Sequence, residues 1–251
     1  MELTVCKHIP HDECRLYGIG DTHLGSSDCD EELLERDIAT IAKDDAARVI
    51  LVGDIFQYDT KTSKGDVYHQ KYPPSQQKKR ARSLFEPIAH KSLAAMGGNH
   101  DEGRTQEDAT PVEDLCEWLG IPYCDTEMFL KIPVGQGRNG KPCVYTLFAT
   151  HGWTSSRTMG AKANALHNLR DIALADIYGI GHTHTMMAFP DTYYVPDLRN
   201  NNVLEVTMKF VNFGSYQKRG RYPKSKGLGP KVLGTPLIRL SGKERKVTVE
   251  I

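Results

Sequence analysis

The stretch RVILVGD, residues 48–54, passes from four consecutive apolar residues directly into a glycine and an aspartate. A short apolar run closed by a turn residue is typical of a strand buried inside a parallel sheet. Helical patterns are expected near 30–46, 76–89 and 111–119, and two further β-like runs accompany them, RLYGIGD (15–21) and SLAAMGGNHD (92–101). This alternation predicts an α/β fold with a largely parallel sheet.

The second half of the chain repeats the theme less regularly. It contains CVYTLFATH (143–151), a helical pattern near 161–174, ADIYGIGHTH (175–184) and then mainly strand-like sequence to the C-terminus. A second, more antiparallel sheet is expected there. A length of 251 residues suits one domain over 1–251.

Composition excludes few function classes. Charged residues make up 25% of the chain, hydrophobic residues 39%, and the formal net charge is zero, so net charge names no partner. Residues 1–50 hold five Lys/Arg against twelve Asp/Glu, whereas residues 201–251 hold eleven against three, which favours an anionic ligand near the C-terminal part. Neither a signal peptide nor a membrane span is indicated, and we expect a cytoplasmic protein. The six cysteines form no CxxC pair and are interpreted as reduced packing residues.

Five apolar runs end in polar residues where the strand should leave the sheet, and ligand sites of open α/β sheets lie at the carboxyl ends of strands. The polar ends are DTH (21–23), GD (53–54), GGNHD (97–101), TH (150–151) and GHTH (181–184). They supply eight candidate side chains: Asp21, His23, Asp54, Asn99, His100, His151, His182 and His184. Carboxylate, imidazole and amide ligands without thiolate suit Mn²⁺, Fe, Zn²⁺, Ni²⁺ or Co²⁺. Eight such groups suffice for two ions sharing one carboxylate, with one histidine left for chemistry.

Each cluster alone has a simpler structural explanation. DTH resembles a helix cap, GNHD a turn, and GHTH an exposed strand end whose two histidines share a face. Glycines beside the clusters, at 53, 98, 152 and 181, fit tight turns or close backbone approach. Five polar clusters at five successive strand ends favour a common site over five separate structural features.

Taken in order, the series D-x-H, G-D, G-N-H-D, H and G-H-x-H resembles the signature of the calcineurin-like metallophosphoesterase superfamily, from Asp21 to His184. The resemblance implies a four-layer α/β/β/α sandwich of two mixed sheets, with the metal site at the C-terminal ends of strands. It implies one ion held by Asp21, His23, Asp54 and His184, and a second held by Asn99, His151 and His182, with Asp54 bridging. His100 would be the catalytic histidine, and Asp101 would orient it or raise its basicity.

The implied cofactors are two divalent ions, with manganese the first expectation. Such ions, about 4 Å apart, would generate a bridging hydroxide for phosphodiester hydrolysis. The absence of a Ser or Cys nucleophile motif agrees with a mechanism that forms no phosphoenzyme.

The substrate class rests on weaker signals. DTHLG (21–25) and GDIF (53–56) are similar to the nuclease subunit of double-strand-break repair complexes, although Gln57 replaces its usual acidic residue and only the catalytic domain is comparable. Residues 151–184 also resemble compact phage and bacterial metallophosphoesterases. Basic side chains are expected to contact a phosphate: Arg157, Lys218, Arg219 and Arg221. DNA or RNA is therefore the leading substrate class.

Two alternatives stay open. A small-molecule phosphoesterase, acting on cyclic nucleotides, nucleotides or phosphomonoesters, would have an enclosed pocket, whereas a nuclease would have an open basic groove. A binding scaffold without turnover would be recognised by its failure to hold metal. Trp153, Met186 and Met187 follow the motifs, and we expect them to pack in the core.

Overall fold

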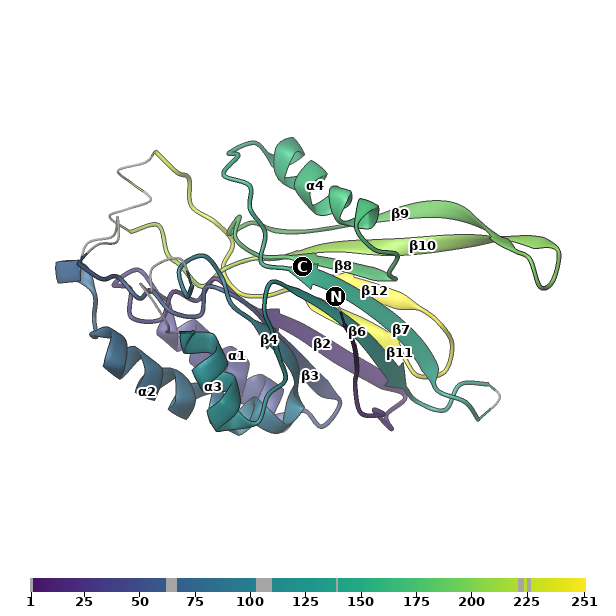
Figure 1. Cartoon of the computed structure of the whole chain (residues 1–251), viewed down its shortest axis with the longest axis horizontal. Helices are drawn as coiled ribbons and strands as arrows, with labels where there is room; N and C mark the ends of the chain where they lie inside the picture. The colour runs from purple at the N-terminus through teal and green to yellow at the C-terminus, as the bar shows by residue number, and fades with distance from the viewer. Residues whose placement is uncertain (1, 62–66, 103–109, 139, 221–223, 225–226) are drawn as a thin grey trace.

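The computed structural model describes residues 2–61, 67–102, 110–138, 140–220, 224 and 227–251, which form two packed sheets with helices outside each (Figure 1). The first sheet has the order β12-β11-β2-β3-β4-β5 in the described part of the chain. Its strands are β2 (Glu13–Ile19), β3 (Ala47–Val52), β4 (Ser92–Met96), β5 (Tyr123–Cys124), β11 (Leu237–Ser241) and β12 (Val247–Glu250). The strands from β2 to β5 are parallel, while β11 is antiparallel to both β2 and β12.

The second sheet has the order β1-β6-β7-β8-β10-β9. Its strands are β1 (Leu3–Val5), β6 (Glu127–Val134), β7 (Cys143–Thr150), β8 (Ile177–Ile180), β9 (Met186–Asp197) and β10 (Asn202–Phe213). β6–β7 and β9–β10 are antiparallel pairs, and the other pairings are parallel. Both sheets are mixed. The expectation that the C-terminal strands belong to the second sheet is wrong for β11 and β12, which extend the first.

Helices α1 (Glu31–Lys43), α2 (Pro74–Phe85) and α3 (Pro111–Leu119) cover the first sheet, and α4 (Met159–His167) covers the second (Figure 1). Short 3-10 turns η1 (Val67–His69), η2 (Glu86–Lys91) and η3 (Asn168–Asp171) complete the helical elements among the described residues. The Asp30 side chain caps α1 by accepting from the Leu33 backbone N–H, and Gly120 ends α3 in the left-handed conformation. The predicted four-layer α/β/β/α arrangement and its four helical segments are confirmed.

Alternation along β3 explains why the layers stack. Val49 and Leu51 are buried against the helices of the first sheet, whereas Ile50 and Val52 are buried against the second sheet. Each such fully buried side chain stabilises the fold by about 1.5–3 kcal/mol relative to an exposed one. The apolar run at residues 49–52 is therefore part of a central strand with both faces covered.

One aromatic ring occupies the space between the sheets near the polar strand ends. A Cβ placed on Gly18 of β2 would lie 2.2 Å from the Phe213 ring, and one placed on Gly179 of β8 would lie 2.5 Å from it. Phe213 is 1% exposed. The ring therefore fits only because both sheets present a glycine to it.

The cysteines agree with the prediction from sequence, whereas Trp153 does not. All six cysteines are free thiols, and burial raises the pKa of Cys14 to about 12, which keeps this buried thiol protonated at neutral pH. Trp153 is 56% exposed, so its expected place in the core is wrong. Within the described ranges, no helix combines the length and apolar composition needed to cross a bilayer.

Candidate metal centre

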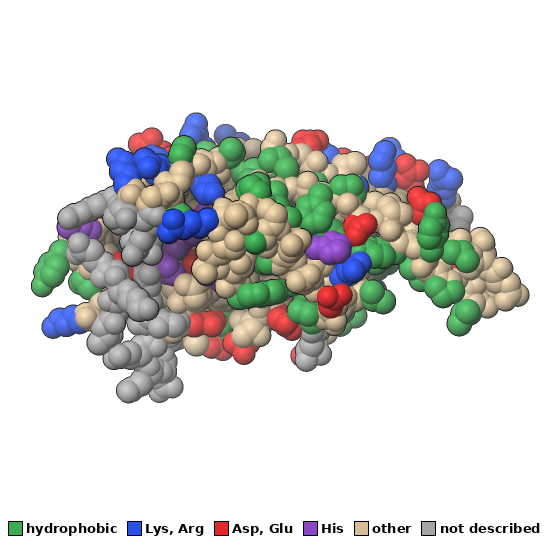
Figure 2. Space-filling view, turned by 90° about the horizontal axis from the view of Figure 1, so that it is seen from above, with side chains coloured by type: hydrophobic (Ala, Val, Ile, Leu, Met, Phe, Trp, Pro, Cys, Tyr) green, Lys and Arg blue, Asp and Glu red, His purple; other side chains and the backbone are tan. Residues whose placement is uncertain are grey.

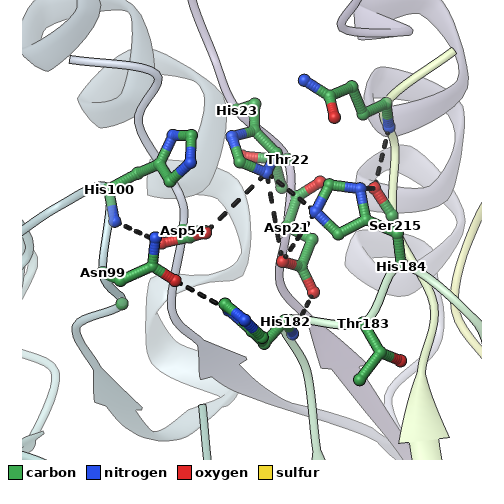
Figure 3. Close-up of polar contacts among 12 residues, drawn as sticks. Asp21, Thr22, His23, Asp54, Asn99, His100, His182, Thr183, His184 and Ser215 are labelled. Carbon is green, nitrogen blue, oxygen red and sulfur yellow. Dashed lines mark hydrogen bonds and ion pairs between the residues drawn. The ribbon is translucent and has the colours of Figure 1, made fainter. Parts of the chain in front are cut away.

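The polar strand ends of both sheets meet at one site (Figure 3). β2, β3 and β4 of the first sheet end at Ile19, Val52 and Met96, and β7 and β8 of the second end at Thr150 and Ile180. The candidate side chains follow these ends within a few residues: Asp21, His23, Asp54, Asn99, His100, His151, His182 and His184. The site therefore lies across the junction of the two sheets, where no single strand could assemble it.

The backbone at this site is unusual. Positive φ angles occur at five of the candidate residues, namely Asp21 (47°), His23 (47°), Asp54 (50°), His182 (63°) and His184 (50°). A non-glycine residue in this region costs on the order of 1–3 kcal/mol and persists only where its surroundings fix it. The strand end offered as a simple explanation of GHTH is wrong, because β8 ends at Ile180 and both histidines lie in the turn beyond it.

Hydrogen bonds between the strand ends hold this backbone in place. The backbone N–H of Asp21 donates to the carbonyl oxygen of Gly53 at 2.9 Å, and that of His23 donates to the carbonyl oxygen of Asp54 at 3.0 Å. The backbone N–H of His182 donates to Oδ2 of Asp21 at 2.7 Å, which joins the second sheet to the first. The strained residues are thus tied to one another.

The first ligand group contains Asp21, His23 and His184, whose ligand atoms all lie within 4.8 Å of one another. Nε2 of His184 is 3.3 Å from Oδ1 of Asp21 and 3.1 Å from Nε2 of His23. The Ser215 hydroxyl donates to the Asp21 carbonyl oxygen at 2.9 Å, so at 3.2 Å it accepts from Nδ1 of His184. We therefore assign the hydrogen of the neutral ring to Nδ1, which leaves the Nε2 lone pair facing the group.

The second ligand group contains Asp54, His151 and His182. Nδ1 of His151 donates to the carbonyl oxygen of Val52 at 2.8 Å, so its Nε2 carries the lone pair of the neutral ring. That Nε2 is 3.3 Å from Oδ2 of Asp54 and 3.2 Å from Oδ1 of Asn99. Oδ1 of Asn99 is also 2.7 Å from Nδ1 of His182. The seven expected ligand residues are therefore brought together in two adjoining groups.

The donor set fits divalent cations. Oδ1 of Asp21 is buried and accepts no hydrogen bond from any residue in the described ranges, although it faces Nε2 of His184. In the second group, Nε2 of His151 faces the oxygens of Asp54 and Asn99, at 3.3 and 3.2 Å, with no further donor from the described residues between them when the ring is neutral. Such atoms repel unless a positive charge lies among them. Oxygen and imidazole ligands without thiolate match borderline divalent ions.

The pKa shifts of the buried residues also indicate that a positive charge belongs next to Asp54. Burial disfavours the charged form of His151, but the Asp54 carboxylate outweighs it and raises the pKa of His151 to about 10. Burial alone would raise the pKa of Asp54, yet the nearby histidines, His151 first, hold it well below its ordinary value. Burial, followed by His151, lowers the pKa of His182. The carboxylate of Asp54 thus requires a positive partner, which is a proton on His151 or a bound cation.

His100 lies beside both groups. With His23 and Asp54 it forms a third set of possible ligands, whose ligand atoms also lie within 4.8 Å of one another. The backbone N–H of His100 donates to Oδ1 of Asp54 at 2.7 Å, and the His100 ring stands edge-on to the His23 ring with centroids 4.4 Å apart. Asp101 is fully buried, and its carboxylate accepts the backbone N–H groups of Ile55, Phe56 and Gly98 at 2.8–3.1 Å. Burial and the nearby Asp54 raise the pKa of Asp101 well above its ordinary value. Asp101 therefore joins the loops after β3 and β4, in addition to any effect on His100.

The expected phosphate contacts are less closely assembled. Arg157 is exposed in the loop between β7 and α4. Nζ of Lys218 lies 3.0 Å from Oδ2 of Asp30, and Arg219 donates from Nε to the carbonyl oxygen of Leu228 at 2.6 Å. Arg221 lies outside the described residues. Figure 2 shows Lys and Arg side chains near histidines at the left end of the molecule.

The sequence predicts no role for Ser215, which lies three residues before the basic residue Lys218. Its hydroxyl contacts Asp21 across 194 residues and His184 across 31. A serine after a strand carries no local signal of such a contact.

The chain is similar to one protein family in sequence and to several solved structures. The family model described as calcineurin-like phosphoesterase matches residues 14–210, and no curated protein matches significantly. Among solved structures, Pseudomonas putida nuclease MPE is 13% identical, with 93% of this chain and 86% of that chain covered and a TM-score of 0.39. A single mutant of Vps29 from Entamoeba histolytica is 15% identical, with 94% and 89% covered and a TM-score of 0.45. The family match spans every strand end that bears a candidate ligand, and the chain belongs to the calcineurin-like phosphoesterase family.

Proposed function

We propose that this metal-dependent phosphoesterase hydrolyses phosphodiesters at a two-ion centre, with nucleic acid as its substrate class and manganese as the first ion to test. The observation that carries the proposal is the position of Asp54 between the two ligand groups. Its Oδ2 lies 3.8 Å from Nε2 of His23 and 3.3 Å from Nε2 of His151. A carboxylate within reach of both groups is suited to be shared by two ions.

Two divalent ions held by these residues would lower the pKa of a bound water and would neutralise charge on the phosphoryl oxygens. The protein's own contribution is to hold and orient the ligands. Ser215 and the carbonyl oxygen of Val52 fix the ring tautomers of His184 and His151, so that each Nε2 faces its group. Ligands whose orientation is fixed before the ion binds lose little entropy when it does.

His100 is proposed as the acid that protonates the leaving oxygen. Its backbone is anchored to Asp54 and its ring lies beside His23, and its ring nitrogen is within 4.8 Å of ligand atoms of both residues. A positioned histidine is the most common general acid at neutral pH. Asp101 supports it by fixing the loop on which it lies.

The exposure of the ligand groups, together with basic residues close in sequence to Ser215, supports nucleic acid over a small ester. Asn99 is exposed and the His184 side chain is 25% exposed, so the ligand groups reach solvent. Ser215 contacts His184, and Lys218 and Arg219 follow within four residues of it. Basic side chains attract phosphates without sequence preference, and an exposed aromatic ring such as that of Trp153 can stack on an unpaired base.

The test is hydrolysis by metal-stripped protein after Mn²⁺ is added, on bis-p-nitrophenyl phosphate, p-nitrophenyl phosphate and labelled single- and double-stranded DNA in parallel. Wild type should cleave the diester and DNA, and Asp54→Asn and His100→Ala should each lose most of this activity while staying folded. Cleavage of the monoester alone, or of the small diester without DNA, would assign a small-molecule substrate. No turnover with any divalent ion would leave a binding scaffold.

A further inference from the structure

Lys162 is a buried lysine whose ammonium group reaches the segment between His182 and His184. It lies on α4, in the outer layer over the second sheet (Figure 1), yet it is only 5% exposed. Its Nζ donates to the carbonyl oxygen of Thr183 at 3.0 Å and to Oγ1 of Thr185 at 2.6 Å. The helix layer therefore contacts the ligand-bearing turn directly.

That turn needs support from outside itself. The backbone N–H of Thr183 donates to the carbonyl oxygen of Gly181 at 2.6 Å, across His182 with its φ of 63°. A three-residue turn with positive φ at its centre is rare and strained. His184 follows with a φ of 50°. A strained conformation persists only where its surroundings determine it.

The surrounding hydrogen bonds leave Thr183 little freedom. Lys162 holds its carbonyl oxygen, and Asn212 donates from Nδ2 to its Oγ1 at 2.6 Å. Oγ1 of Thr185 donates to the same carbonyl oxygen at 3.1 Å and accepts from both Lys162 and Nζ of Lys231, the latter at 3.4 Å. The residue between the two histidines is thus fixed by its backbone and by its side chain.

We propose that Lys162 is a positioning residue for the metal centre, which holds the Thr183 carbonyl oxygen and thereby sets the separation of the His182 and His184 rings. The inference rests on the proposed function, in which these two histidines serve neighbouring ions. Without the ammonium group, the turn can relax from its strained conformation and the two ring nitrogens move apart. Residues that orient metal ligands typically contribute 10- to 100-fold to metal affinity.

The experiment compares Lys162→Met with Lys91→Met. Lys91 is also buried, and its Nζ donates to three carbonyl oxygens at the C-terminal end of α1, those of Ile41, Ala42 and Asp44. It lies just before β4 begins, at the end of the strands away from the metal centre. Both variants replace a buried ammonium group by an apolar side chain of similar length, so they share the structural cost of the change.

Mn²⁺ affinity is measured by titration calorimetry, stability by urea unfolding of the metal-free protein, and ligand geometry by the visible absorption of the Co²⁺ form. Lys162→Met should bind Mn²⁺ at least about tenfold more weakly than Lys91→Met and show an altered Co²⁺ spectrum. Lys91→Met should lose stability alone. Equal Mn²⁺ affinity and an unchanged Co²⁺ spectrum in Lys162→Met would overturn the inference.

A second variant covers the case in which Lys162→Met does not fold. Thr185→Val keeps the shape of the side chain but removes the hydroxyl that links Lys162 to the Thr183 carbonyl oxygen. It should weaken Mn²⁺ binding in the same direction, and wild-type affinity in this variant would also contradict the inference. Failure of wild type itself to bind Mn²⁺ would instead contradict the proposed function, so the two failures are distinguishable.

Discussion

Substituting Gly98 by alanine should displace Asp54, the carboxylate that lies between the two ligand groups. A Cβ at position 98 would lie 2.3 Å from the backbone nitrogen of Asp54 and 2.3 Å from its Oδ1. Ordinary contact begins at 3.4 Å, so the added methyl is about 1 Å too close to two atoms of one residue. A new Asp54 rotamer relieves only the contact with the carboxylate, because the backbone nitrogen stays where it is.

A misplacement of about 1 Å in a catalytic group costs on the order of 100-fold in rate, equivalent to about 2.7 kcal/mol of transition-state stabilisation. Overpacking costs about 1–3 kcal/mol of folding stability. Gly98→Ala should therefore fold, with a lowered urea midpoint, and hydrolyse bis-p-nitrophenyl phosphate about 100-fold more slowly in Mn²⁺.

Gly160→Ala is the matched control for this prediction. Gly160 lies in α4, and a Cβ placed there meets no atom within 4 Å outside its chain neighbours and the backbone of its own helix. This alanine should leave turnover unchanged and stabilise the helix by about 0.5–1 kcal/mol. If Gly98→Ala is as active as Gly160→Ala, the close approach to Asp54 does not position that carboxylate and the reasoning is refuted.

Three further predictions follow from the geometry of the site. With a pKa of about 10, His151 is protonated at pH 8 and must lose that proton before it can bind an ion. Mn²⁺ affinity should therefore rise with pH, and calorimetry in two buffers should detect about one proton released on binding. A binding enthalpy that is the same in both buffers would contradict this. Ser215→Ala removes the hydroxyl that accepts a hydrogen bond from Nδ1 of His184, and it should weaken Mn²⁺ binding about 10- to 100-fold. Ser156→Ala, in the loop before α4, should leave Mn²⁺ affinity unchanged. Equal Mn²⁺ affinities of the two variants would show that Ser215 does not orient the His184 ring. Trp153→Ala should weaken single-stranded DNA binding by about 1–3 kcal/mol in a fluorescence titration and leave bis-p-nitrophenyl phosphate turnover intact, and unchanged DNA binding would remove this residue from the nucleic-acid surface.

The sequence was enough to predict that the candidate ligand residues lie close together, because parallel strands bring their carboxyl ends to one edge of a sheet. Asp54 and Asn99 each follow a buried apolar run within a few residues, and local sequence is enough to place them there. The same local patterns gave the helices. The side chains that a strand end contributes to a site lie within a few residues of that end in the sequence. The parallel arrangement of the strands then brings these ends together.

The pairing of strands that are far apart in the chain had no comparable signal in the local sequence. β11 adds to β2 through pairs such as Leu237 with Tyr17, and nothing in either segment specifies which sheet edge the C-terminal strands extend. The roles of Ser215 and Lys162 depend on equally distant partners. The positive φ angles at the candidate ligands could not be predicted either. An aspartate or histidine in the sequence occurs equally at an ordinary strand end and in a strained turn that its neighbours hold in place.

The ring of Phe213, held between Gly18 and Gly179, restricts how this sequence can diverge. Alanine at either glycine would place a methyl within 2.5 Å of the ring, and a smaller side chain at 213 would leave a void between the sheets. Single substitutions at these positions are therefore unfavourable, while paired changes that exchange volume between the ring and a glycine are tolerable. Relatives that keep the same sheet separation should vary at these three positions together, and an alignment would show them as a covarying set although they are far apart in the chain.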